Sequence, residues 1–222
     1  MRRFHILAVA AAVALLSAAA VAQAVQYQID PVHSSAQFSV RHMMVSNVRG
    51  EFAKVTGTVV YDSKNPKASS VEATIDATTI NTHEPRRDDQ LKGPDFFDVA
   101  KYPTLTFKSK KVEPAGAGKL RMTGDLTIHG VTKEVVLDVE GPTAEVKMGP
   151  DLKAGASAST TINRKDFGLM WNRVLESGGV MVGDEVKITL EIEMGRKVAP
   201  APAKSSGAAS KNSLAVPSPP MS

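Results

Sequence analysis

The segment 185-EVKITLEIE-193 alternates strictly between apolar and polar residues. Val186, Ile188, Leu190 and Ile192 take one set of alternate positions, and charged residues or threonine take the other. Because successive side chains of a β-strand point to opposite faces, this pattern predicts a strand with one dry and one wet face. Such one-sided strands are typical of antiparallel sheets. The segment therefore predicts an all-β fold.

The same alternation recurs along the chain between glycine- and proline-containing turns. The sets expected to face inward are Ala36, Phe38 and Val40; Val71, Ala73, Ile75 and Ala77; Leu120, Met122, Leu126 and Ile128; and Val135, Leu137 and Val139. About eight such strands can close into an antiparallel barrel, and a two-sheet sandwich is the competing architecture. One or two short helices are expected, within residues 41–52 and 88–100.

The segment 87-RDDQLKGPDFFDVAKYPTLTF-107 interrupts the alternation. Asp88 and Asp89 suit the first turn of a short helix, where negative charge is favoured. Phe96 and Phe97 are adjacent aromatics that need burial, so we interpret the segment as a loop that folds over an open end of the barrel. The alternative is a loop that packs a small core of its own, without a ligand. Space inside the barrel is suggested by small residues expected to face inward, namely Ala36, Ala73, Ala77, Ala154, Ala156 and Ala158.

Both ends of the chain differ from the middle. Residues 1–24 have two arginines, an apolar run and the small-x-small motif Ala22-Gln23-Ala24, which together predict a cleaved signal peptide. Residues 25–194 are predicted to form one domain. Residues 195–222 are rich in proline, alanine and serine, so they predict a disordered tail.

Charge and cysteine content exclude several classes of protein. The chain has 27 basic and 23 acidic residues, but the predicted leader and tail hold six of the bases and none of the acids. The predicted domain therefore has 21 bases against 23 acids, which gives no reason to expect nucleic-acid binding. The absence of cysteine excludes disulfides, thiol catalysis and cysteine metal sites.

Motifs that would indicate catalysis are also lacking from the sequence. It has no nucleophile elbow, zinc-protease helix, phosphate-binding loop or dinucleotide-binding glycine motif. The four histidines after the predicted leader, His33, His42, His83 and His129, have no histidine partner at metal-ligand spacing. We therefore expect no catalytic residue, no metal and no cofactor.

Ordered motifs run through residues 27–194. They are Tyr27-x-Ile-Asp30, Phe38-x-Val-x-His42, Phe96-Phe97-Asp98, Tyr102-Pro103, Gly124 to Thr132, Asn163-Arg164-x-Asp-Phe-Gly168 and Gly183-Asp184-x-Val186. Together they resemble the YceI-like family of exported bacterial proteins, also called polyisoprenoid-binding or lipocalin-like domains. The resemblance implies a lipocalin-like, eight-stranded antiparallel barrel that holds a long apolar chain lengthwise, and no established catalytic activity.

We therefore predict an exported lipid-binding protein, not an enzyme, which holds a polyisoprenoid or fatty-acid-like chain for transport, storage or sequestration. The periplasm is the expected location, with an extracellular destination as the alternative. The expected chain after cleavage has no membrane span, and a homodimer is left open. Two other functions remain: an envelope stress-related barrel without a ligand, and an enzyme that uses His42 with an aspartate on a bound lipid.

The expected ligand-binding residues fall into two groups. His42, Arg87 and Asn172 are candidates for contact with a polar head group. The apolar chain is expected to contact Phe38, Val40, Phe52, Leu91, Phe96, Phe107, Leu126, Met170, Trp171 and Ile188.

Overall fold

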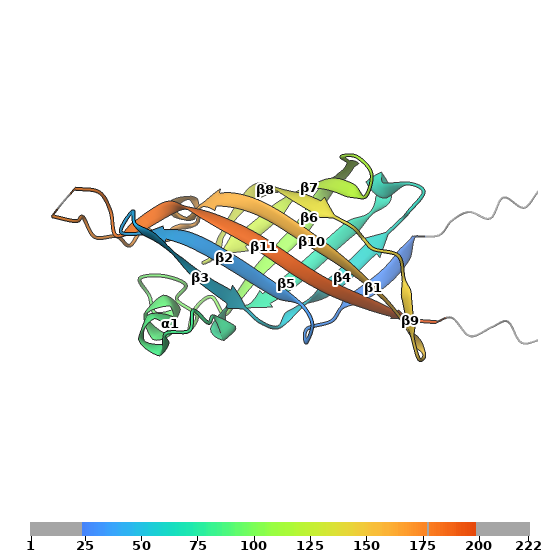
Figure 1. Ribbon diagram of the computed structural model, residues 1–222, viewed down its shortest axis with the longest axis horizontal. Helices are drawn as coiled ribbons and strands as arrows, with labels where there is room; N and C mark the ends of the chain where they lie inside the picture. The colour runs from blue at the N-terminus through green and yellow to red at the C-terminus, as the bar shows by residue number, and fades with distance from the viewer. Residues whose placement is uncertain (1–23, 177, 199–222) are drawn as a thin grey trace, which may run out of the picture.

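The computed structural model describes residues 24–176 and 178–198, most of which lie in β-strands (Figure 1). The predicted signal peptide up to residue 23 and the predicted tail from residue 199 lie outside the described residues. The strands are β1 (Val25–Ile29), β2 (Ser35–His42), β3 (Ser46–Phe52), β4 (Val55–Tyr61), β5 (Ser70–Asp76), β6 (Thr104–Pro114), β7 (Lys119–Ile128), β8 (Val131–Glu140), β9 (Val146–Met148), β10 (Asp151–Asn163) and β11 (Val182–Lys197).

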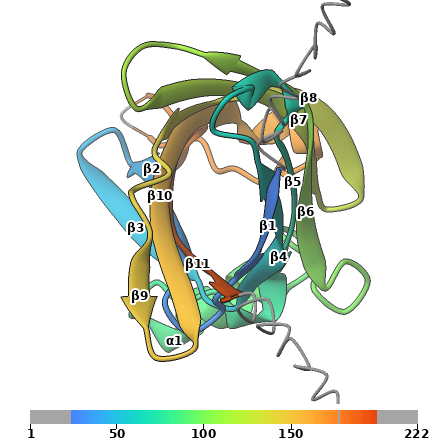
Figure 2. The ribbon, with the colours of Figure 1, turned by 90° about the vertical axis from the view of Figure 1, so that its right-hand side faces the viewer.

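The strands form one closed antiparallel barrel. β2 pairs with the first part of β11 and β1 pairs with its last part, so β1 and β2 together occupy a single position in the barrel. β3 and β4 share the next position, because β3 pairs with β2 and β4 pairs with β1. The order continues through β5, β6, β7, β8 and β10, and the pairing of β10 with β11 closes the ring (Figure 2). The prediction of an eight-stranded antiparallel barrel is confirmed, and the sandwich is excluded.

The core of the protein is the barrel interior. The alternate residues predicted to face inward line it, as the sets on β2, β5, β7, β8 and β11 show. The largest cluster of buried side chains lies toward the end of the barrel near Phe52 and Phe167, and a second cluster surrounds Val112 on β6. Strand periodicity therefore predicted the part of the core that these five strands contribute.

The structure describes one α-helix, α1 (Pro85–Lys92). The Glu84 carboxylate accepts from the Arg86 N–H at its start, and Pro85 occupies the first turn, where its missing N–H costs no hydrogen bond. The helix ends at Lys92, and the N–H of its C-cap, Gly93, donates to the Gln90 carbonyl oxygen. Three short 3-10 helices complete the fold: η1 (Pro66–Ala68), η2 (Ala77–Thr79) and η3 (Arg164–Phe167). Within the described residues, no helix is long and apolar enough to cross a membrane.

The expected helix at 41–52 is wrong, because this segment is a hairpin. β2 ends at His42, a turn with left-handed backbone at Met43 and Met44 follows, and β3 begins at Ser46. The pairing of Val40 with Val48 gives the backbone of both strands partners that a short exposed helix would lack.

The predicted boundary of the tail is also wrong by three residues. Gly195, Arg196 and Lys197 belong to β11, where they pair with β10. The Arg196 guanidinium binds the Glu145 carboxylate through two contacts of 2.7 and 2.9 Å, and Tyr27 Oη donates to the same carboxylate. Because Arg196 and Lys197 belong to the domain, its basic residues rise to 23 and equal its acidic residues.

Candidate functional site

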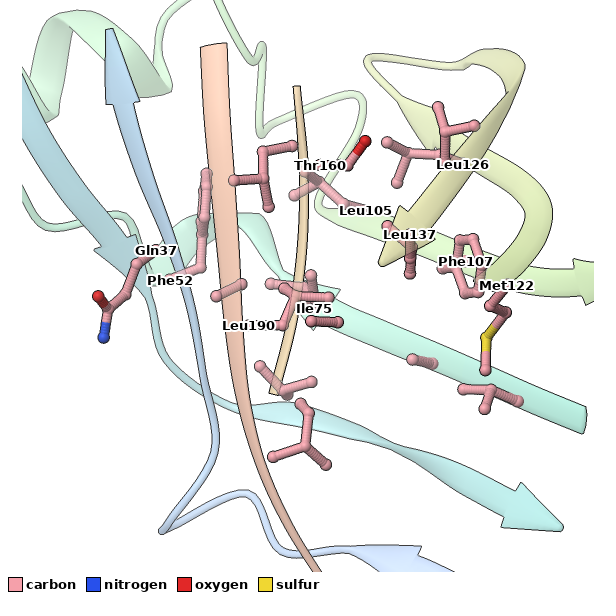
Figure 3. Close-up of a pocket in the computed structure, with 18 of the residues that line it drawn as sticks. Gln37, Phe52, Ile75, Leu105, Phe107, Met122, Leu126, Leu137, Thr160 and Leu190 are labelled. Carbon is pink, nitrogen blue, oxygen red and sulfur yellow. The ribbon is translucent and has the colours of Figure 1, made fainter. Parts of the chain in front are cut away.

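The barrel encloses a cavity of about 240 Å³ (Figure 3). Well-packed protein interiors contain few voids larger than a water molecule, and an apolar cavity of about 150 Å³ is large enough to bind benzene. The cavity is therefore too large to be an ordinary packing defect. Its walls draw side chains from β1 to β8, from β10 and β11, and from the segment that contains α1.

The lining is apolar along the length of the barrel. Phe107, Met122, Leu126, Leu137 and Leu190 point inward among other aliphatic side chains (Figure 3). The polar residues beside the cavity are Gln37, which points away from the apolar group in Figure 3, and Tyr61, Ser69, Ser157, Thr160 and Arg164. Such a surface stabilises apolar chains and disfavours water or charge.

Arg164 is the only charged residue in the lining among the residues that the structure describes, and it is 4% exposed. It is the first residue of η3, directly after the end of β10 at Asn163. Its guanidinium donates to the carbonyl oxygens of Leu169, Trp171 and Gly183, the last two at 2.9 Å. Burial lowers the pKa of Arg164, and the nearby Asp184 carboxylate counteracts part of this effect. Arg164 therefore anchors the loop between η3 and β11, because its donors are used by the protein itself.

The segment between β5 and β6 closes one side of the barrel near the turn that joins β2 and β3. Its Leu91, Phe96 and Phe97 line the cavity, which confirms that this loop closes the apolar interior. The Phe97 ring meets the Phe52 ring edge-on at 5.3 Å, and the Phe96 ring lies 5.2 Å from Trp171.

A buried polar contact holds this segment in place. The side chain of Asp88 accepts hydrogen bonds from the N–H and the hydroxyl of Thr82, which is 4% exposed. Arg87 donates to the Thr82 hydroxyl and carbonyl oxygens, both at 2.8 Å. These contacts fix the start of α1 and thereby orient the phenylalanines that follow it.

Comparison with known proteins places this barrel among its relatives. The model of the YceI-like domain matches residues 27–194. The chain belongs to the YceI-like family. UPF0312 protein SAS2572 of Staphylococcus aureus is 36% identical over 168 residues, which cover 75% of this chain and 95% of that protein. A UPF0312 protein of Vibrio cholerae is 37% identical over 158 residues, covering 70% and 84% of the two chains.

Three solved structures have a similar fold. The Campylobacter jejuni YceI protein matches with a TM-score of 0.59 and 32% identity, covering 71% of this chain and 90% of that one. Burkholderia cenocepacia BcnA matches with a TM-score of 0.64 and 27% identity, covering 74% and 98%. A polyisoprenoid binding domain from Saccharophagus degradans matches with a TM-score of 0.52 at 16% identity, covering 76% and 97%, which shows similarity of fold alone.

In this YceI-like domain, most of the residues predicted to contact a ligand chain lie in one place. Phe38, Val40, Phe52, Leu91, Phe96, Phe107, Leu126 and Ile188 all line the cavity. Met170 and Trp171 do not line it: Met170 is 61% exposed, and Trp171 packs behind Phe96. A change of parity after the η3 turn, where strand alternation stops, explains their different position.

The three candidates for a head-group contact lie outside the lining. The Arg87 guanidinium is committed to Thr82, and the Asn172 side chain bonds to the backbone of Val182 at 2.7 and 3.1 Å. His42 is half-buried at the end of β2, where it pairs with Ser46 and Val182. These side chains support the loops around the cavity, and the structure does not bring them together as a head-group site.

Sequence reasoning missed much of the lining. Ile29, Val55, Val59, Leu105, Val112, Ile162 and Met194 all contribute, and their strand parity was the signal that could have found them. Arg164 was also missed, because it lies in η3, where strand parity does not apply. Outside the cavity, Asp30, His33 and Glu193 lie close enough together to resemble a set of metal ligands. The Lys153 ammonium, however, lies 2.7 Å from the Asp30 carboxylate and 3.1 Å from the Glu193 carboxylate, so a cation of the protein itself already neutralises this pair.

Proposed function

We propose that this protein binds the apolar chain of a lipid, either a polyisoprenoid or a fatty-acid-like amphiphile, inside its barrel. The observation that carries this proposal is the apolar cavity of about 240 Å³ enclosed by a closed barrel. An empty apolar cavity of that size costs about 6 kcal/mol of packing at roughly 24 cal/mol per Å³. A bound chain restores those contacts, so the barrel is most stable when it is filled.

The cavity volume sets how much of a chain it can hold. A cavity of about 240 Å³ exceeds the one of about 150 Å³ that holds benzene, so it can hold several methylene groups of a chain without rearrangement. A longer chain must displace flexible lining side chains such as Met122, or extend beyond the cavity.

Binding, not catalysis, is the function that this site supports. Among the residues that the structure describes, the lining offers no nucleophile beside a general base. Its charged residue, Arg164, has its donors bound to backbone carbonyl oxygens and to Asp184. A polar head group inside the cavity would lack hydrogen-bond partners, so binding of the head group there is disfavoured. Selection is therefore by chain length and shape.

Transport, storage or sequestration in the cell envelope is the role that we propose for such binding. Support for export comes from the signal-peptide pattern in residues 1–24. The Saccharophagus degradans domain of the same fold is named for polyisoprenoid binding, which agrees with a chain-shaped ligand.

The test is native mass spectrometry of protein purified from its own envelope, followed by organic extraction of the bound material. We expect a discrete lipid that is released on unfolding. Bare protein that also refuses added isoprenoids and fatty acids would overturn the proposal.

A matched pair of variants tests where the lipid lies. Phe107→Asp introduces a carboxylate into the cavity and should abolish lipid binding. Thr106→Asp introduces the same charge at the neighbouring exposed position of β6 and should leave binding intact. Folding of both variants is checked by circular dichroism, and equal binding by folded forms of the two would contradict an internal site.

A further inference from the structure

Two loops at one end of the barrel expose large apolar side chains. The β2–β3 turn carries Met43, Met44 and Val45, which are 42%, 54% and 75% exposed. The loop between η3 and β11 carries Met170 and Val174, which are 61% and 78% exposed. Single exposed apolar residues are common on soluble proteins, but a contiguous group marks an interaction site.

The two loops form a single surface. The Met43 N–H donates to the Met181 carbonyl oxygen at 2.7 Å, and Met44 Cγ lies 3.6 Å from the point where Gly179 would carry a Cβ. Figure 1 shows both loops together beyond the end of the barrel, opposite to β9. We call the surface made by residues 43–45, 170–176 and 178–180 the apolar tip.

The apolar tip continues into the cavity. Leu169 and Val182 flank its longer loop, and both line the cavity. Trp171 in the same loop packs against Phe96, which also lines the cavity. An apolar chain that moves between the cavity and the tip therefore meets apolar side chains along the way.

Two exposed arginines lie at the apolar tip. Arg173 belongs to its longer loop, which also contains Glu176, and Arg41 flanks the β2–β3 turn. Arg41 donates to the Met44 carbonyl oxygen at 2.8 Å, so its cation is held beside the exposed methionines. Exposed apolar side chains beside arginines are the chemistry that binds the interface of an anionic bilayer.

We propose that the apolar tip docks on the surface of an anionic lipid bilayer, with its methionines and valines among the head groups. The inference rests on the proposed function, because a protein that carries a water-insoluble chain must exchange that chain with a membrane. Docking at this end places the cavity beside the bilayer, so that the chain can pass without exposure to water.

The test is flotation of the purified protein with vesicles of phosphatidylglycerol or of phosphatidylcholine. We expect binding to the anionic vesicles, and about fivefold weaker binding for Arg173→Ala, as the loss of one cation near the surface predicts. Val45→Asp and Val174→Asp should each weaken binding at least tenfold, since each places a charge in the interface. The matched control is Val146→Asp in β9, where the valine is 66% exposed at the opposite end of the barrel, and it should bind like the unaltered protein.

Uptake of a fluorescent fatty-acid probe in vesicle-free solution separates the two proposals. Unaltered protein that takes up the probe but ignores both kinds of vesicle would overturn membrane docking alone. Protein that takes up no probe would overturn the proposed function. Tip variants that keep full vesicle binding would also overturn docking, because the tip would then contact no bilayer. Tip variants that keep vesicle binding but lose self-association in sedimentation would assign the tip to a second copy of this chain.

Discussion

Filling part of the cavity should affect stability and binding in opposite directions. Ala158 lines the cavity from β10, between Val139 on β8 and Leu190 on β11. Ala158→Leu adds three carbon atoms at a position that faces the empty volume. In a ligand-binding cavity, this change should raise stability and weaken ligand binding. In a packing defect that binds no ligand, it should raise stability alone.

The size of the effect follows from the volume. Three added carbons contribute about 2.4 kcal/mol at about 0.8 kcal/mol each, and they occupy about 100 Å³. That is less than half of the cavity of about 240 Å³, so the new side chain fits. After some cost in strain, we expect the free energy of unfolding of lipid-free protein to rise by about 1–2 kcal/mol. A ligand chain that filled the cavity loses the same 2.4 kcal/mol, which weakens its binding on the order of fiftyfold.

Two measurements on delipidated protein check this prediction. Urea unfolding gives the change in stability, and competition against a fluorescent fatty-acid probe gives the affinity for a series of chain lengths. The control is Ser159→Leu, which adds a leucine at the adjacent exposed position of β10 and should alter stability by less than about 0.5 kcal/mol. Unchanged affinity together with raised stability would refute the idea that ligands occupy this volume. Lowered stability in a folded variant would show that the cavity has no room for three more carbon atoms beside Ala158.

Three further predictions concern the frame of the barrel. Gly50→Ala should destabilise the fold by about 1–3 kcal/mol in urea, because its Cβ would lie 2.5 Å from the Phe38 ring, and a second change of Phe38→Leu should recover most of the loss. Hydrogen bonds from Lys153 and other donors hold the pKa of Asp30 well below its ordinary value. The ionised Asp30 therefore stabilises the folded state above about pH 4, and this stabilisation is lost on further acidification. Asp30→Asn should flatten this acid dependence in unfolding titrations. Arg164→Met should cost about 3 kcal/mol or more, and hydrogen exchange should accelerate in residues 169–176 and 178–183 first, since their carbonyl oxygens lose a buried donor.

Strand parity explains which predictions succeeded. Alternation assigned the inward sets of β2, β5, β7, β8 and β11, because the period of two is a property of the local backbone. The hairpin at 41–52 was mistaken for a helix, since short apolar runs without clear alternation do not distinguish the two structures. Met170 and Trp171 were predicted to line the cavity although they follow the η3 turn, beyond which strand parity carries no information.

The sequence by itself determined the all-β class, the family and the apolar character of the interior, because these follow from periodicity and motif order. Periodicity did not separate a barrel from a sandwich, and only the resemblance to the family implied the barrel. Tertiary structure decided what remained. It showed that Arg87 and Asn172 support loops, that Arg164 anchors the loop before β11, and that Met43, Met44 and Val45 share a surface with Met170 and Val174. These outcomes depend on contacts between residues far apart in the chain, and no local pattern records which partner each side chain meets when the barrel closes.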